Sequence, residues 1–194
     1  MLKKIKKDSK KINIHLGCGE KNHPDFINVD INYYPHIDYQ TDVSNLSMFR
    51  DNYADLIYNS HTLEYFDREE AIKVLLEWKR VLKKGGICRI AVPNFAEIIK
   101  IYQNENDINA KGIIGPLFGR WKNHNDGSFL YHKTVYDFKS LKELLIHVGF
   151  KNIKRYDWKD TFHANLDDYS QAYIPHMDKE NGTLISLNVE AEKT

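Results

Sequence analysis

The chain has 194 residues, 42% hydrophobic and 28% charged, which is enough for one domain with a sizeable core and too short for several. Lys and Arg number 28 against 27 Asp and Glu, so the net charge of +1 argues against a dedicated nucleic-acid binder, which needs a basic surface. The longest apolar runs fall well short of the ~20 residues of a membrane helix, so no membrane insertion is expected.

The N-terminus and the two cysteines bear on the compartment. Residues 1–11 read MLKKIKKDSKK, and the apolar stretch of a signal peptide does not follow them, so we expect residues 1–11 to be flexible. Cys18 and Cys88 are too few for a disulfide framework and lack metal-ligand spacing. We therefore expect a single domain over residues 1–194, located in the reducing cytoplasm, with no metal.

Short apolar runs ending in polar residues dominate the first third of the chain and predict strands. The runs cover residues 12–16, 26–30, 37–43 and 54–59. Between Gly19 and Phe26 the printed sequence leaves only residues 20–25, whereas a parallel crossover usually needs about a dozen residues and a helix. We therefore expect the first crossovers to be shortened to loops.

The clearest helix begins at Asp67, where Glu70 completes a capping-box pattern. Apolar residues then recur on one face, and the pair Gly85-Gly86 is expected to stop the helix before a strand over residues 87–92. This order of helix and strand is typical of an α/β sheet.

A second capped helix is predicted from Asp137 to the terminator Gly149. Two late strands are predicted at residues 151–158 and 184–190, with a long polar stretch between them and no convincing helix. They are expected to pair antiparallel at one edge of the sheet.

The chemistry-bearing feature is the glycine turn Gly17-Cys18-Gly19 after the first strand, together with Asp30 at the end of the second. Glycines let a ligand approach the backbone closely, and a carboxylate can accept hydrogen bonds from the two hydroxyls of a ribose. This pairing is a nucleoside-binding site in outline, although a tight turn with no ligand would also explain the glycines.

Five ordered motifs carry a resemblance to a family. They are INIHLGCGE, FINVDI, TDVSNL, ADLIYNSHTLEYF and LLEWKRVLKKGGICRIAVPNF, and the match continues through LKELLIHVGF to GTLISLNVEAEK. The chain resembles class I S-adenosylmethionine-dependent methyltransferases, in particular the compact bacterial methyltransferase-type-11-like group. The resemblance implies a Rossmann-like sheet, mostly parallel with a C-terminal antiparallel strand pair, and S-adenosylmethionine as cofactor.

The resemblance also implies site residues. The glycine turn would lie beneath the methionine part of the cofactor, Asp30 would bind the ribose, and Asp42 would accept from the adenine amino group. The full implied cofactor set is His15, Gly17, Cys18, Gly19, Asp30, Ile31, Asp42, Val43, Asn59, Ser60 and His61.

Methyl transfer from a sulfonium is an in-line displacement that a protein assists mainly by alignment and by removing water. An oxygen or nitrogen acceptor can also require a general base. We expect His61 or His132 to act as this general base. The motif of His61 places it beside the methyl donor.

Two irregular segments, residues 107–133 and 159–181, mix aromatic, amide and glycine residues and are the expected acceptor-binding segments. Such side chains suit a small hydroxylated acceptor such as a sugar or glycan precursor; ordinary surface loops are the alternative. Two other functions stay open. The first is an NAD-dependent oxidoreductase, whose G-x-G-x-x-G motif requires a glycine at the position of Asn22. The second is a non-catalytic binding module, which would keep the fold but not bind the methyl donor.

Overall fold

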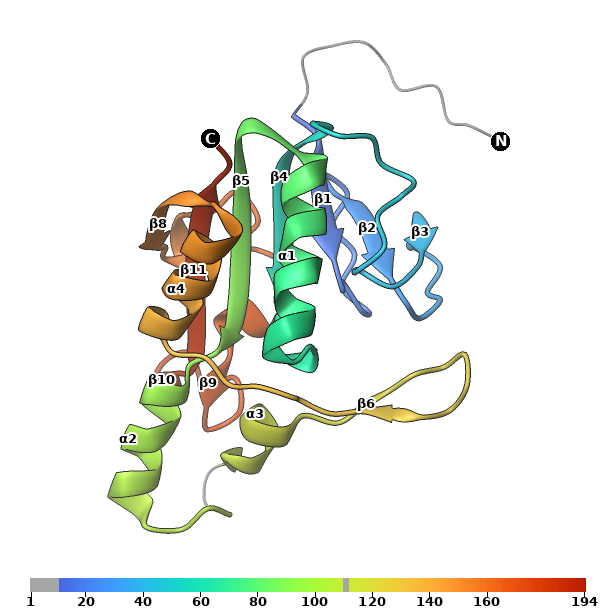
Figure 1. Cartoon of the computed structure of the whole chain (residues 1–194). Helices are drawn as coiled ribbons and strands as arrows, with labels where there is room; N and C mark the ends of the chain where they lie inside the picture. The colour runs from blue at the N-terminus through green and yellow to red at the C-terminus, as the bar shows by residue number, and fades with distance from the viewer. Residues whose placement is uncertain (1–10, 110–111) are drawn as a thin grey trace.

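The computed structural model describes residues 11–109 and 112–194, so the predicted flexibility of residues 1–11 lies, apart from Lys11, outside the described residues. A seven-stranded sheet in the order β3-β2-β1-β4-β5-β11-β8 forms the centre of the molecule (Figure 1). Its strands are β1 (Asn13–Leu16), β2 (Ile27–Asp30), β3 (Tyr39–Gln40), β4 (Ala54–Ser60), β5 (Leu82–Pro93), β8 (Lys151–Arg155) and β11 (Ser186–Glu192).

The strand directions confirm the predicted sheet. β1 pairs in parallel with β2 and β4, and the parallel pairing continues to β3 and β5. β11 runs antiparallel between β5 and β8. The sheet is therefore mostly parallel with the expected C-terminal antiparallel pair.

The first crossovers are loops, as expected. Within the described residues, the structure has no α-helix before α1 (Arg68–Val81). α1 and α4 (Phe138–Val148) cover one face of the sheet and enclose the main core (Figure 1). On the other face, an aromatic cluster made of His15, Phe26, Tyr58, Phe162 and His163 packs together. A C-terminal segment thus covers a face where a crossover helix is absent.

Capping fixes both predicted helices. The Asp67 side chain accepts from the N–H groups of Glu69 and Glu70, and the capping box is complete. Asp137 caps α4, which ends at Gly149 as expected. The predicted end of the first helix is wrong, because α1 stops at Val81, before Gly85-Gly86, and the chain enters β5 directly. A shift in the β4–β5 register absorbs the extra residues.

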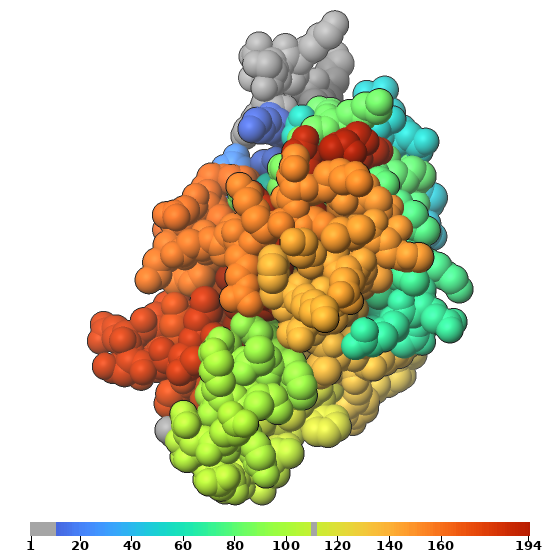
Figure 2. Space-filling view, turned by 60° about the vertical axis from the view of Figure 1, so that its left-hand side comes forward, coloured from blue at the N-terminus to red at the C-terminus, as the bar shows by residue number. Residues whose placement is uncertain are grey.

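The connection after β5 contains structure that the sequence analysis did not predict. α2 (Phe95–Glu105) lies beside the hairpin of β9 (Tyr173–Ile174) and β10 (Thr183–Leu184) at one end of the molecule (Figure 2). A small core joins them, made of Ile98, Ile101, Ile113, Ala172, Ile174 and Ile185. α3 (Ile114–Phe118) and a second hairpin, of β6 (Trp121–Lys122) and β7 (Phe129–Leu130), follow. Within the described residues, no helix is long and apolar enough to cross a membrane.

Candidate active site

The glycine turn and Asp30 meet at the carboxyl ends of β1 and β2, which we call the donor edge (residues 17–19 and 30–32). Gly19 N donates to Asp30 Oδ2 and Asn32 N to Oδ1, each over 2.8 Å. Burial raises the pKa of the Asp30 carboxyl above its usual value, while these two N–H groups oppose the rise. Each oxygen keeps a further lone pair, so the carboxylate can still accept from a ligand.

The Thr62 side chain, just after β4, packs closely against the glycine turn. Gly17 has a φ of +67°, and a Cβ there would overlap the Thr62 side chain, whose Cγ2 and Cβ would lie 2.8 and 2.9 Å away. Only glycine therefore fits this position. Thr62 follows the end of β4, so the same contact joins the donor edge to the β4 loop.

The hairpin of residues 121–130 lies across the donor edge (Figure 1). Asn32, fully buried, holds it at both ends of its amide: Nδ2 donates to the Lys122 carbonyl over 3.0 Å and Oδ1 accepts from His124 N over 2.7 Å. Asn125 Nδ2 donates to the Ile31 carbonyl over 2.9 Å. Part of the predicted acceptor segment thus lies against the donor edge.

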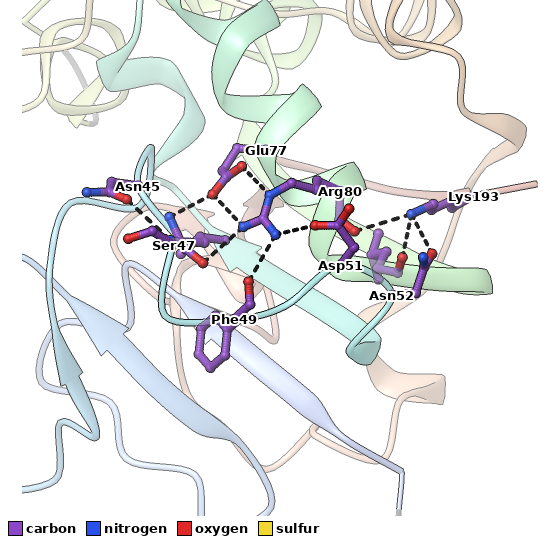
Figure 3. A network of polar contacts seen from close by, with 10 residues as sticks. Asn45, Ser47, Phe49, Asp51, Asn52, Glu77, Arg80 and Lys193 are labelled. Carbon is purple, nitrogen blue, oxygen red and sulfur yellow. Dashed lines mark hydrogen bonds and ion pairs between the residues drawn. The ribbon is translucent and has the colours of Figure 1, made fainter.

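The loop that carries Asp42 and Val43 is fixed from α1. Arg80 binds Glu77 and Asp51 and donates to the Phe49 carbonyl over 2.9 Å (Figure 3). Trp78 Nε1 donates to the Val43 carbonyl over 2.9 Å. Asp42 is exposed and accepts from Ser44 N over 2.7 Å. α1 therefore holds this loop beside the sheet through polar contacts at several points.

The end of β4 presents the other predicted residues. Asn59 Nδ2 donates to the Leu16 carbonyl over 2.9 Å and so bridges β4 to β1. Its Oδ1 is buried without a hydrogen-bond partner among the described residues. Ser60 is buried next to it, and His61 adopts a left-handed backbone with a φ of +52°. A strained backbone of this kind is most often found at functional sites.

His61 and His132, far apart in sequence, meet at a buried glutamate; we call the three residues the histidine cluster. Glu64 Oε1 lies 3.6 Å from His61 Nδ1 and 3.7 Å from His132 Nε2. Burial raises the pKa of Glu64 to about 8 and lowers that of His61 to about 3, with His132 contributing to the latter. Burial also lowers the pKa of His132. The sequence analysis missed Glu64; its place three residues after His61 was the available signal.

The remaining predicted residues lie around these two places. Burial raises the pKa of the Cys18 thiol, so the thiol stays neutral in the turn. His15 lies in the aromatic cluster, its ring centroid 4.9 Å from that of Tyr58, and it is buried. Cofactor binding by His15 stays a prediction that this packing does not support.

The second predicted acceptor segment is anchored from the sheet. Tyr58 OH donates to Asp168 Oδ2 over 2.6 Å, and Asp168 Oδ1 accepts from Ser170 N over 2.8 Å. This anchor brings Tyr169 within 5.5 Å of His61, measured between ring centroids. Two open cavities of about 350 and 360 Å³ lie elsewhere, the first at Asn13, Arg89 and Phe162 and the second at Trp158.

Comparison with known proteins now adds to this geometry. Residues 15–90 match the family model described as a methyltransferase domain. The fold is similar to that of a SAM-dependent methyltransferase from Archaeoglobus fulgidus, with a TM-score of 0.57 and 16% identity over 95% of this chain and 87% of that one. Residues 15–90 thus resemble a methyltransferase domain, and the chain has the fold of SAM-dependent methyltransferases.

Other solved structures share this methyltransferase fold. One is 1,6-didemethyltoxoflavin-N1-methyltransferase from Burkholderia thailandensis with S-adenosylhomocysteine, with a TM-score of 0.54 and 14% identity over 95% of this chain and 71% of that one. Another is a possible histamine N-methyltransferase from Thermotoga maritima, with a TM-score of 0.56 and 15% identity over 95% of this chain and 82% of that one. Comparison with curated proteins gives no significant match.

S-adenosylmethionine is the cofactor that this fold implies, and the donor edge fits it. Gly19 leaves the backbone of the turn open to close approach, because it carries no Cβ and only the Trp121 ring comes near the place of one, at 3.7 Å. Asp30 retains lone pairs for ribose hydroxyls. The orphaned Oδ1 of Asn59 is a buried acceptor that a donor group of a ligand would satisfy.

Proposed function

We propose that the methyltransferase transfers a methyl group from S-adenosylmethionine to a small hydroxylated acceptor such as a sugar or glycan precursor. The observation that carries this proposal is the histidine cluster, because its members His61 and Glu64 lie on either side of Thr62, which packs onto Gly17 at the donor edge. A hydroxyl needs a base as it attacks, because its proton must leave. When bound, S-adenosylmethionine supplies an electrophilic methyl carbon on a sulfonium.

The proposed donor site uses both sides of the β1–β4 contact. The backbone of Gly17, Cys18 and Gly19 would hold the methionine part, and Asp30 would bind the ribose beside Ile31. Asp42 and the Val43 backbone would hold the adenine. Asn59, Ser60 and His61 would lie nearest the methyl group. Ligands of open parallel sheets bind at this switch point beyond the carboxyl ends of the strands, which supports the proposal.

The proposed acceptor site draws on residues 107–133 and 159–181. The first segment contributes His132 to the histidine cluster, and the second places Tyr169 against His61. An aromatic ring and hydrogen-bonding groups around a base suit a polar small molecule. The near-neutral net charge of +1 disfavours nucleic acid as acceptor. A cytoplasmic location stays a prediction, which fractionation of the native source would test.

Thermal unfolding with S-adenosylhomocysteine, with NAD and without ligand tests the donor half of the proposal. A ligand at ~100 times its Kd stabilises the native state by about 2.7 kcal/mol, which raises the Tm by several degrees. We expect the shift with S-adenosylhomocysteine alone. A shift with NAD alone would favour an oxidoreductase, and no shift with either ligand would favour a non-catalytic module.

The acceptor half requires a transfer assay. Radiolabelled methyl transfer from S-adenosylmethionine would be measured on pools of monosaccharides, nucleotide sugars, heteroaromatic amines and total RNA. We expect label in a sugar pool. The Burkholderia neighbour is named for N1-methyl transfer, so label only in the amines would replace the hydroxylated acceptor by a nitrogen acceptor. Label only in RNA would contradict the proposal.

A further inference from the structure

Glu64 is a buried carboxyl whose two oxygens have no hydrogen-bond partner among the described residues. Its side chain is 1% exposed, against 10% for His61 and 7% for His132. An ionised carboxylate in such a place is costly, because burial removes its hydration without replacing it. Whether this carboxyl carries a proton therefore depends on where the two neighbouring histidine rings carry theirs.

The tautomer of His61 follows from a chain of hydrogen bonds behind it. Asn188 Nδ2 donates to the Ser170 carbonyl over 2.9 Å, which leaves Asn188 Oδ1 as the acceptor facing Ser186. The Ser186 hydroxyl donates its single proton to that oxygen over 3.1 Å. Ser186 Oγ can then only accept from His61 Nε2, 3.1 Å away. Neutral His61 thus carries its proton on Nε2 and turns the lone pair of Nδ1 toward Glu64.

His132 is fixed in the opposite tautomer. Its Nδ1 lies 3.0 Å from the Pro116 carbonyl oxygen, which can only accept, so Nδ1 carries the proton. Nε2, on the side of Glu64, is left with a lone pair. Both rings therefore offer lone pairs to one carboxyl, and one proton must lie among the three groups.

We propose that His61, Glu64 and His132 share a single proton and serve together as the base of the methyl transfer, with Glu64 as the positioning residue that holds the proton behind the two rings. This inference rests on the proposed function. The rings are the members that retain exposure, so the acceptor proton enters at a ring nitrogen. Burial places the pKa of Glu64 at about 8, near the range in which a base works best.

The protons and electrons of this step balance. The cluster first loses its shared proton to water and carries one negative charge. The O–H bond of the acceptor then breaks, and its electron pair forms the bond to the methyl carbon. Its proton passes to His61 Nδ1 or His132 Nε2, the ring nitrogens beside Glu64, because the other nitrogen of each ring already carries a proton. The pair of the broken sulfur–carbon bond stays on sulfur. The cluster thereby returns to its neutral, one-proton form.

Among the described residues, three tyrosines are further titratable groups around the carboxyl: Tyr65 from η1 (Leu63–Tyr65), Tyr136 just before α4, and Tyr169 from η4 (Tyr169–Gln171). Burial and the nearby carboxyl raise the pKa of both Tyr65 and Tyr136, so these phenols stay neutral where the cluster titrates. Arg68 and Asp67 lie beyond Tyr136 and act on it with opposite signs.

Long-range ¹⁵N–¹H spectra of the histidine rings between pH 5 and 10 test the inference on the whole chain. We expect His61 as the Nε2–H tautomer and His132 as the Nδ1–H tautomer, with both rings reporting one common step near pH 8. Glu64→Gln keeps the shape and can donate an N–H to a ring lone pair, but it cannot lose the shared proton. The step should therefore vanish in this variant and persist in Glu143→Gln, which alters an exposed carboxyl of α4.

The wild-type spectrum is decisive even if Glu64→Gln fails to fold. Reversed tautomers, or two rings that titrate separately near pH 6.5, would overturn the inference. A stoichiometric divalent metal in the purified protein would also overturn it, because the metal would occupy the same lone pairs. Calorimetry with S-adenosylhomocysteine runs in parallel. Lack of binding by the wild type contradicts the proposed function, while the ring spectra still decide whether the proton is shared.

With an acceptor identified, the pH profile adds a kinetic readout. We expect wild-type kcat/KM to rise about tenfold per pH unit below pH 8 and then to level off. In Glu64→Gln the profile should be flat over this range and lower by about 10²-fold at pH 9. A parallel profile in the two proteins would mean that Glu64 only fills space.

Discussion

The donor edge and the histidine cluster belong to one proposed active site but are built in different ways. The donor edge comes from residues 17–32, and its contacts are largely backbone N–H groups held by Asp30. The histidine cluster takes its members and their hydrogen-bond partners from the residue after β4, from η1, from α3, from the segment before α4 and from β11. One half of the site is local in sequence, whereas the other exists only in the folded chain.

The largest effect is expected in the pH dependence of the free energy of unfolding. Burial lowers the pKa of His15, His61 and His163 to about 3 each, so between pH 6.5 and 3 the unfolded chain binds more protons and stability falls as the pH falls. Glu64, with a raised pKa of about 8, works in the opposite direction and lowers stability as the pH rises toward 8.

The net expectation is a stability maximum near pH 7 and a loss of about 3 kcal/mol on going to pH 5. Urea unfolding at half-unit pH steps would measure it. In Glu64→Gln the decline above pH 7 should disappear while the acid limb stays. A profile without an acid limb would mean that the buried rings are already protonated in the folded protein.

Gly17→Ala tests the packing that joins the two regions. The new Cβ would overlap Thr62 and sit on a backbone with a φ of +67°, so we expect a loss of about 3 kcal/mol in urea unfolding. Gly85→Ala is the matched control, because its φ is +74° and nothing lies within 4 Å of the added Cβ. It should cost about 1 kcal/mol; equal losses in the two variants would remove Thr62 from the explanation.

Asp30→Ala is directed at the donor edge alone. We expect the affinity for S-adenosylhomocysteine to fall by about 1.5 kcal/mol or more, because ribose hydroxyls lose their acceptor. Asp38→Ala is the comparison, since Asp38 also accepts a backbone N–H, from Asn28 over 2.9 Å, but lies outside the proposed site. Calorimetry that gives both variants the wild-type affinity would take Asp30 out of the site.

Asn32→Ala should have the smallest effect of the series. It removes two hydrogen bonds to the hairpin of residues 121–130, so we expect the amide of His124 to exchange about tenfold faster, which corresponds to about 1.4 kcal/mol of local opening. Gln40→Ala, which removes a single exposed bond to Asn125, should change this rate less. The reverse order would mean that Asn32 does not hold the hairpin.

The sequence predicts the features that depend on neighbouring residues, but not those that depend on long-range contacts. The glycine turn, the two capped helices and the order of the motifs fix the sheet, because each depends on residues near one another in the chain. α2 was not predicted, since its apolar face packs against Ile113, Leu117 and the late hairpin, in a core that exists only in the folded chain. Glu64 gave little signal, because a single acidic residue after β4 has meaning only when His132 approaches from 68 positions later.

The place of β11 has a consequence for how the protein is made. This strand, the last in the chain, pairs along its length with β5 on one side and with β8 on the other. Until residues 186–192 leave the ribosome, both of those strands keep an open edge that can pair with other chains. The nascent protein therefore stays open to such pairing until residues 186–192 have emerged, long after the donor edge has been translated.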